Sequence, residues 1–214
     1  MRSLFGSRER QPATQESTSS DRVSRHSSGW AQARRFMNSR ESLRVLDIGP
    51  TSPANISYVT GLGHSIYMTN LVQEAAKSEW LLPSEEGEPD FYDVERFITT
   101  NLAFAGREFD VVLFWDTADY LPEPLLAPVL NHIQQVMVRD GQLLVFFHSK
   151  DIGVDTSFCR YHLTDTDTVE MQRAGDYPLL QLYNNRQIER LFSSFSSYRF
   201  FLAKDNLREV IVAR

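Results

Sequence analysis

Two apolar runs of the sequence end in residues that could take part in chemistry. The run Leu43–Ile48 contains Asp47 and is followed by Gly49, and the run Val111–Trp115 is followed by Asp116. A carboxylate beside a reacting group can accept a proton from a nucleophile, and a glycine lets a ligand approach the backbone without meeting a Cβ atom. These residues predict a ligand-binding loop after the first run and a candidate general base after the second.

The spacing of apolar side chains indicates the elements that must position these residues. Val111–Trp115 is apolar throughout, which is typical of a strand that is covered on both faces. The predicted strands are 43–48, 64–69, 97–100, 111–115, 142–148, 198–202 and 210–212, and the predicted helices are 29–39, 53–62, 125–138 and 184–195. Strands that alternate with helices favour an α/β doubly wound fold with a mostly parallel sheet, and the last two strands predict a C-terminal antiparallel hairpin.

Residues that directly follow a predicted strand are the candidates for a binding site. An open parallel sheet binds its ligand beyond the carboxyl ends of its strands, near the point where the strand order reverses. The chain offers four such segments, which are 47–55, 69–71, 99–101 and 115–120. We expect them to lie at one edge of the sheet.

The charge of the chain favours a small-molecule ligand over nucleic acid. The formal net charge is −6 and the isoelectric point is near 5.4, whereas a surface that neutralises phosphates needs clustered lysine and arginine. The charge is uneven, because residues 1–42 hold eight arginines and four acidic residues. We expect no general nucleic-acid binding, although this basic segment could contact RNA or an acidic partner. The sequence indicates no oligomeric state.

Residues 1–28 are predicted to be a disordered, basic, serine-rich tail. They contain eight serines and only five apolar residues, too few to offset the entropy of ordering. Residues 29–214 are predicted to form one α/β domain. Within it, residues 149–183 show no clear period, and a connection of this length is a candidate for a lid or a substrate-facing insertion.

The cysteine count and the absence of long apolar runs indicate the cellular setting. Cys159 is the single cysteine, so no internal disulfide is possible. No apolar run reaches the roughly 18 residues of a membrane-spanning helix, and Met1–Gly6 lacks the features of a secretory signal. We therefore expect a soluble, cytoplasmic protein. Asp165-Thr166-Asp167 lacks the glycine and terminal glutamate of a calcium loop, so no metal site is predicted.

Four pieces of the chain follow one another in a recognisable order and spacing. They are Val45–Gly49, Gly63–Tyr67, Glu108–Leu113 and Arg139–Leu144. In that order they resemble the first motif, the entry to the second strand, the fourth strand, and the turn before the fifth strand of class I S-adenosylmethionine-dependent methyltransferases. The resemblance covers roughly residues 43–214. It implies a Rossmann-like methyltransferase fold with a seven-stranded sheet, whose last strand inserts antiparallel to the rest.

The resemblance also implies S-adenosylmethionine as the cofactor and a set of residues that bind it. In the family, the backbone of the first loop approaches the methionine part of the cofactor, and the residue at the position of Asn70 accepts hydrogen bonds from the ribose. Trp115 would pack on the sulfonium as a cation–π partner. The positions carried over are Asp47, Gly49, Thr51, Asn55, Asn70, Leu71, Asn101 and Trp115 for the cofactor, and Asp116 as the catalytic base.

Three positions depart from the family pattern. Thr51 and Pro53 stand where the family has its second and third glycines, and Asn70 stands where it has an acid. Pro53 removes a backbone donor and fixes φ, although it is also well suited to the first position of a helix. Asn70 can still accept a hydrogen bond, but a bond to an uncharged group is weaker than one to a carboxylate.

Structural roles compete with catalytic ones for several side chains. Asp116 is either a general base or the cap of the following helix, and a cap is the more common role for Asp119. Trp115 is either a cofactor contact or a core residue. His148 follows a predicted strand and His162 lies in the insertion, so each is a candidate for proton transfer or for a structural role.

Two functions of different classes follow from these observations. The first is a methyltransferase that passes a methyl group to a small-molecule acceptor by in-line displacement, which depends mainly on orientation of the nucleophile. The second is a methyltransferase-like module that no longer catalyses and serves in binding or regulation, as Thr51, Pro53 and Asn70 suggest. A nicotinamide oxidoreductase is disfavoured, because the first strand–helix turn lacks the GxGxxG fingerprint. We expect the enzyme.

Overall fold

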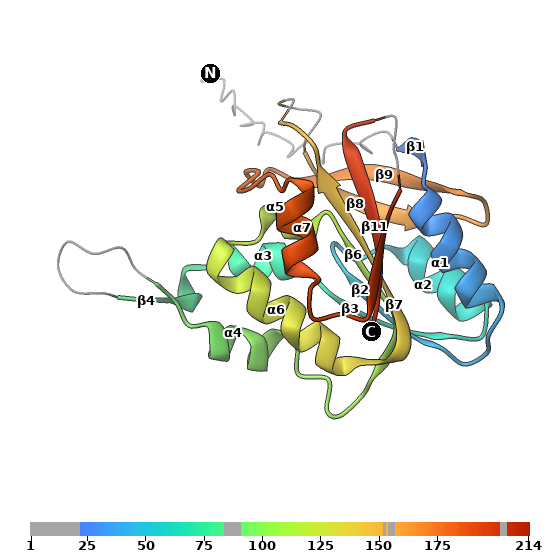
Figure 1. Cartoon of the computed structure of the whole chain (residues 1–214), viewed down its shortest axis with the longest axis horizontal. Helices are drawn as coiled ribbons and strands as arrows, with labels where there is room; N and C mark the ends of the chain where they lie inside the picture. The colour runs from blue at the N-terminus through green and yellow to red at the C-terminus, as the bar shows by residue number, and fades with distance from the viewer. Residues whose placement is uncertain (1–21, 84–90, 152, 154–156, 202–204) are drawn as a thin grey trace, which may run out of the picture.

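The chain forms a central mixed sheet with helices on both faces and a second, smaller sheet beside it (Figure 1). The computed structural model describes residues 22–83, 91–151, 153, 157–201 and 205–214. Among these residues, none of the helices combines the length and apolar character needed to cross a bilayer.

The central sheet contains six strands in the order β10-β11-β7-β6-β2-β3. Their bounds are β2 (Arg44–Ile48), β3 (Ser65–Thr69), β6 (Phe109–Trp115), β7 (Met137–His148), β10 (Ser197–Phe201) and β11 (Leu207–Ala213). The four strands β3, β2, β6 and β7 are parallel, whereas β11 is antiparallel to β7 and β10 is antiparallel to β11. This confirms the predicted α/β class and the mostly parallel sheet.

The predicted seventh strand is not part of this sheet. Residues 97–100 belong to helix α4 (Val94–Asn101), so the expected count of seven strands is wrong for the described chain. Asp93 caps this helix by accepting a hydrogen bond from the backbone N–H of Arg96, at 3.1 Å. Val94, Phe97 and Ile98 recur at helical spacing and pack against the core, a period that a window of four residues is too short to reveal.

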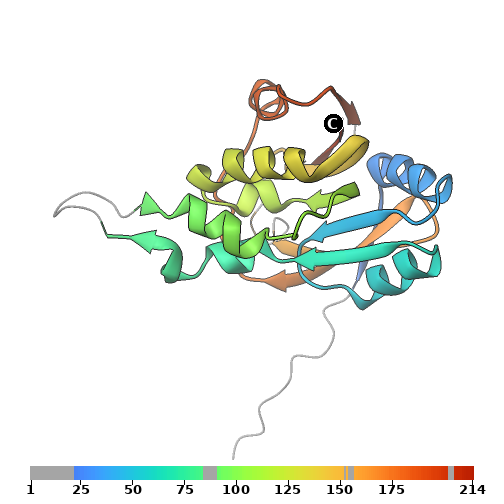
Figure 2. The same ribbon diagram turned by 90° about the horizontal axis from the view of Figure 1, so that it is seen from below.

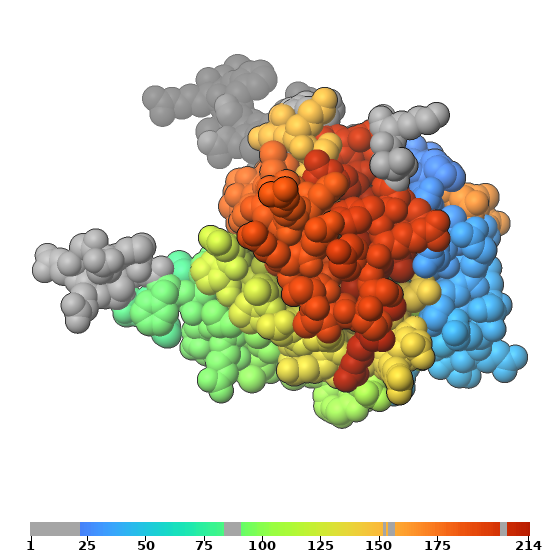
Figure 3. Space-filling view, viewed as in Figure 1, coloured from blue at the N-terminus to red at the C-terminus, as the bar shows by residue number. Residues whose placement is uncertain are grey.

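The two faces of the central sheet are covered by different elements, because successive residues of a strand point to opposite sides. Leu46 and Ile48 pack with α3, α4, α6 and α7, whereas Val45 packs with α1, α2 and the smaller sheet. The ribbon views show α6 and α7 on one side of the sheet and α1 and α2 on the other (Figures 1 and 2). The space-filling view shows the C-terminal segment with α7 lying beside α6 on the first face (Figure 3). The remaining elements are α1 (Ser28–Asn38), α2 (Pro53–Gly61), α3 (Leu71–Ala75), η1 (Ser78–Trp80), β4 (Leu81–Leu82), β5 (Phe91–Tyr92), α5 (Thr117–Tyr120), α6 (Glu123–Val136) and α7 (Asn185–Leu191).

The smaller sheet corrects two expectations about the chain. It contains β1 (Val23–His26), β9 (Thr168–Gly175) and β8 (Phe158–Leu163), paired antiparallel in that order. The predicted disordered tail is therefore wrong for its last residues, which pair with β9 and begin α1, while residues 1–21 lie outside the described chain. The insertion at 149–183 supplies β8 and β9, so its lack of helical period reflects a strand pair.

A buried carboxylate fastens this N-terminal segment to the central sheet. Glu209 of β11 is 2% exposed and accepts hydrogen bonds from the backbone N–H of Gly29 (2.5 Å) and the hydroxyl of Ser27 (3.0 Å). It also pairs with the guanidinium of Arg25 in β1, which bonds Asp205 through two further nitrogens. An anion at a helix N-terminus is favourable, and loss of one partner of a buried ion pair leaves an uncompensated charge, so β1 and α1 depend on Glu209.

Substituting Glu209 tests this dependence. Glu209→Ala leaves Arg25 and the N-terminus of α1 buried with fewer partners, so we expect the free energy of unfolding to fall by about 2–4 kcal/mol. Urea denaturation followed by circular dichroism measures the change. The control is Glu170→Ala, because the exposed pair of Arg22 and Glu170 contributes about 0–1 kcal/mol. Equal losses in the two variants would contradict the role given to Glu209.

Candidate functional site

The predicted site segments meet where the strand order reverses. From β2 the chain proceeds to β3 on one side, whereas from β6 it proceeds to β7 on the other, so the switch point lies between β2 and β6. The hydroxyl of Thr117, just after β6, donates a hydrogen bond of 3.1 Å to the carbonyl of Ile48 in β2. We call this region, built from Asp47, Gly49, Asn55, Trp115 and Asp116, the switch-point corner.

Asp47 is the central polar group of the switch-point corner. Its carboxylate is 2% exposed and accepts a hydrogen bond on each oxygen, from the side-chain amide of Asn55 and from the indole N–H of Trp115, both at 2.7 Å. Burial raises the pKa of Asp47 to about 6, and the two donors limit that rise. The structure therefore brings together three of the predicted cofactor positions by direct bonds.

The loop after β2 is bonded to β8 of the smaller sheet. Ser52 caps α2 by accepting from the backbone N–H of Asn55, and Pro53 occupies the first turn, the structural role weighed for it. The Asn55 side chain accepts from the backbone N–H of Leu163 at 2.7 Å and donates to the carbonyl of Tyr161 at 3.0 Å. The hydroxyl of Ser52 lies 2.8 Å from Nδ1 of His162.

An aromatic pair covers the glycine of this loop. The ring of Tyr161 stacks on that of Trp115 with centroids 4.8 Å apart and planes 6° from parallel. Trp115 has φ of +50°, which is unusual for a bulky residue, and a Cβ built on Gly49 would lie 3.3 Å from its Cδ1 atom. Since both rings are 2% exposed, the backbone of Gly49 faces protein side chains and not solvent.

Two buried carboxyl groups follow β6, and neither caps a helix through its side chain. Asp116 accepts a hydrogen bond of 3.0 Å from the hydroxyl of Tyr161, and burial raises its pKa to about 7. Asp119 accepts from the backbone N–H of His148 (2.6 Å) and lies 2.9 Å from its Nδ1 atom. One oxygen of each carboxyl has no hydrogen-bond partner among the described residues.

The interaction with Asp119 determines the state of His148. Burial alone lowers the pKa of His148, but the hydrogen bond to Asp119 and the nearby charge of Asp116 raise it above its ordinary value overall. His148 thus acts as a partner of Asp119. The role of Asp119 as a helix cap is not observed, since α6 begins at Glu123 with no side-chain cap.

The other predicted site residues lie around the switch-point corner or away from it. Asn70 ends β3 and caps α3 by accepting from the backbone N–H of Gln73, and the neighbouring Leu71 is fully buried. Thr51 is exposed. Asn101 ends helix α4 and donates to the carbonyl of Phe97, so it does not follow a strand as expected.

The sequence analysis missed Tyr161, the residue that joins the smaller sheet to the switch-point corner. The alternation of Cys159, Tyr161 and Leu163 with more polar neighbours is a strand signal that could have revealed it. His162 was weighed as a proton-transfer group, and it instead contacts Ser52 and Gln172. Burial lowers its pKa, which is consistent with a neutral imidazole in these contacts.

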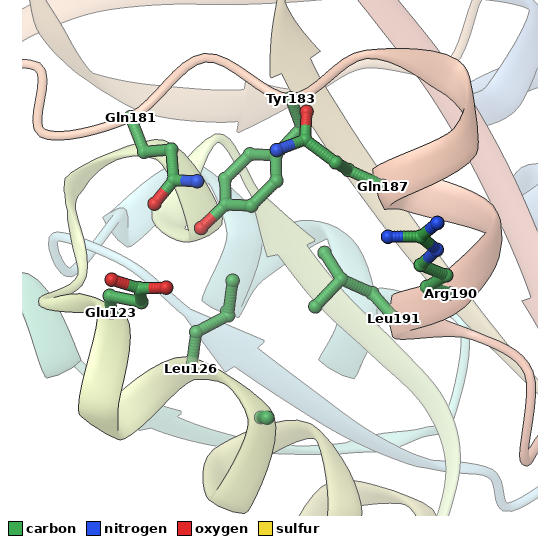
Figure 4. Close-up of a pocket in the computed structure, with 8 residues that line it drawn as sticks. Glu123, Leu126, Gln181, Tyr183, Gln187, Arg190 and Leu191 are labelled. Atoms are coloured by element: carbon green, nitrogen blue, oxygen red, sulfur yellow. The ribbon is translucent and has the colours of Figure 1, made fainter.

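Several cavities of the described chain lie outside the switch-point corner, and two of them border helices near it or the C-terminal helix. One of about 290 Å³ lies between α6, α7 and the segment before α7, with the hydroxyl of Tyr183 directed into it on the side of Glu123 (Figure 4). The other, of about 190 Å³, lies at the carboxyl edge of the sheet between α3 and α5. It is lined by Val72, Ala75, Ala76, Tyr92, Tyr120, Pro122, Tyr177, Pro178 and Leu180. Neither is lined by Asp47, Gly49 or Trp115.

Solved structures that resemble this chain are S-adenosylmethionine-dependent methyltransferases of low sequence identity. They include a structure assigned as an O-methyltransferase from Nostoc punctiforme (13% identical, 86% of this chain and 55% of that one, TM-score 0.45). Others are a magnesium protoporphyrin IX methyltransferase from Synechocystis with bound S-adenosylmethionine (13%, 86% and 77%, 0.44) and an S-adenosylmethionine-dependent methyltransferase from Clostridium acetobutylicum (12%, 86% and 89%, 0.42). No protein-family model and no curated protein matches the sequence.

The buried acid Asp116 makes stability depend on pH. An acid whose pKa is raised by folding binds its proton more tightly in the folded state, so stability falls as pH rises from about 4 to about 7. Asp116→Asn keeps an acceptor for Tyr161 but removes the charge, while Asp119 and His148 remain. We expect the variant to be about 1–4 kcal/mol more stable than the original chain at pH 8, with the difference vanishing near pH 4.

Urea denaturation at several pH values measures this difference. Asp140→Asn is the matched control, because Asp140 is an exposed residue of β7 with φ of +62°, a conformation that asparagine also adopts. The control should follow the original chain at every pH. A stability gain for Asp116→Asn that is the same at pH 4 and pH 8 would contradict a buried, titrating carboxyl group.

Proposed function

We propose that this chain is an S-adenosylmethionine-dependent methyltransferase that acts on a small-molecule acceptor. One observation carries the proposal: the strand order brings the residues after three different strands to a single switch point. These are Asp47 near the end of β2 with Gly49 after it, Asn70 after β3, and Asp116 after β6. Open α/β sheets bind their ligands at this point.

The chemistry of Asp116 supports the proposal. A general base works best when its pKa is close to the working pH, and burial raises the pKa of Asp116 to about 7. Its hydrogen bond to Tyr161 fixes one carboxylate oxygen, while the other has no partner among the described residues. In our proposal this second oxygen accepts the proton of the acceptor's nucleophile.

A small organic acceptor is supported by charge and by cavity size. The net charge of −6 disfavours polyanionic substrates. The cavity of about 190 Å³ at the carboxyl edge has tyrosine, proline and aliphatic walls, and its Tyr120 belongs to α5, directly after Asp116. Walls of this kind suit a compact, uncharged ring better than a polymer.

The switch-point corner, as it is arranged, does not fit the methionine part of the cofactor. Both oxygens of Asp47 are occupied by Asn55 and Trp115, and Trp115 lies over Gly49. The face of Trp115 that a sulfonium would use is covered by Tyr161. The proposed function therefore requires a second arrangement, in which these side chains separate.

This closed arrangement favours a second candidate, a non-catalytic methyltransferase-like module. In such a module the polar groups inherited from a cofactor site would hold the smaller sheet instead of a ligand. The specific observation is the triple use of Asn55, which bonds Asp47, Tyr161 and Leu163. Under this candidate the two sheets form one permanent unit.

Calorimetric titration of the purified chain with S-adenosylmethionine and with S-adenosylhomocysteine separates the two candidates. Binding of both compounds in the micromolar range supports the methyltransferase. Lack of binding up to millimolar concentration, with the far-UV circular dichroism of a folded α/β protein, favours the module.

Replacing Asn70 by aspartate tests the proposed ribose contact by a gain of affinity. Asn70→Asp restores a charged acceptor and retains the cap of α3, because aspartate caps a helix as well as asparagine. Hydrogen bonds to ionised groups are roughly twice as strong as neutral ones, so we expect S-adenosylhomocysteine to bind about 3- to 10-fold more tightly. Asn184→Asp, at the N-cap of α7, is the matched control and should leave the affinity unchanged. Equal affinities in the two variants would remove Asn70 from the site.

A further inference from the structure

The strand β8 lies against the switch-point corner. Its residues Tyr161, His162 and Leu163 each contact a residue of the loop after β2 or of the end of β6. These contacts span sequence separations of 45 to 110 residues, so tertiary structure alone brings them together.

The contacts made by β8 resemble those of a bound ligand more than those of an apolar core. Tyr161 presents a flat ring to Trp115 and a hydroxyl to Asp116. The backbone of β8 supplies one N–H and one carbonyl to the side chain of Asn55. A flat ring that stacks and polar groups that bond in pairs are the features by which polar sites bind organic molecules.

The switch-point corner also retains features that β8 does not satisfy. Asp116 is 1% exposed, and its second oxygen has no partner among the described residues. Trp115 is held at a positive φ while it donates to Asp47, a conformation that costs energy and persists at functional sites. Neither feature is expected of a contact optimised only for packing.

We propose that β8 is a self-bound occupant of the switch-point corner, with Tyr161 in the place of a ligand, and that a ligand must displace it to bind. This inference rests on the proposed function, since the competing ligand is S-adenosylmethionine or S-adenosylhomocysteine. The strands β8, β9 and β1 are joined by their own backbone hydrogen bonds, so the proposed displacement does not require the smaller sheet to unfold.

Self-occupation predicts how mutations change affinity. The apparent dissociation constant equals the intrinsic constant divided by the fraction of molecules that are open, so a variant that weakens closure binds more tightly. Tyr161→Phe removes only the hydrogen bond to Asp116 and retains the stacked ring. His162→Ala removes the contacts with Ser52 and Gln172 without touching Asp47, Trp115 or Asp116.

The experiment is calorimetric titration of the full chain and its variants with S-adenosylhomocysteine. We expect Tyr161→Phe and His162→Ala each to bind about 3- to 10-fold more tightly than the original chain. Tyr198→Phe, on the half-exposed strand β10, is the matched control and should bind as the original chain does. Circular dichroism of each variant establishes that it is folded.

Amide hydrogen exchange gives a second readout that is independent of affinity. The N–H of Leu163 is bonded to the side chain of Asn55, so displacement of β8 exposes it. Saturating S-adenosylhomocysteine should therefore accelerate exchange at Leu163, whereas the N–H of Val45 in the central sheet should be unaffected. Ligands usually slow exchange near their site, so acceleration is a specific sign of displacement.

The outcomes separate this inference from the proposed function. Tighter binding by both variants, with faster exchange at Leu163, supports self-occupation. If the original chain binds and both folded variants bind with equal or lower affinity, self-occupation is overturned and the methyltransferase proposal still stands. No binding by the original chain or by either variant overturns both, and the second candidate function then takes their place.

Discussion

A carboxylate buried at the end of a central strand must be satisfied by donors, and this requirement shapes the structure around Asp47. Its donors are Asn55, one turn into α2, and Trp115, the last residue of β6. The bond to Trp115 holds that ring over Gly49 and fixes a backbone with positive φ. The same ring stacks on Tyr161, so the hydrogen bond between Trp115 and Asp47 also helps to position the smaller sheet.

The departures from the usual methyltransferase loop have local explanations in this fold. Pro53 lies in the first turn of α2, where its missing N–H costs nothing, and Ser52 before it caps the helix. The same Ser52 also contacts His162 of β8. The loop is therefore built for a helix start and a strand contact. A glycine-rich loop would supply neither the cap nor the contact with His162, but it would leave more room for a ligand to approach the backbone of the loop.

Burial gives the switch-point corner an electrostatic character that the net charge does not reveal. Asp47, Asp116 and the nearby Asp119 are each buried, and burial raises the pKa of each. Asp119 has His148 as its hydrogen-bond partner, whereas the carboxyl of Asp116 accepts a hydrogen bond from the hydroxyl of Tyr161. An acid whose pKa is close to physiological pH can gain or lose a proton at a small cost in free energy, which is why such acids are found at functional sites.

The sequence by itself determined the fold class, because apolar period and run length report which faces of a strand or helix are buried. It also predicted that Asp47, Trp115 and Asp116 would lie at one edge of the sheet, since the carboxyl ends of parallel strands meet there. It did not reveal α4, whose few residues resemble a short strand, or the pairing of β1 with β9. Only the tertiary structure decided that β8 covers this edge, because contacts such as that of Asn55 with Leu163 join residues 108 positions apart, and no local pattern encodes them.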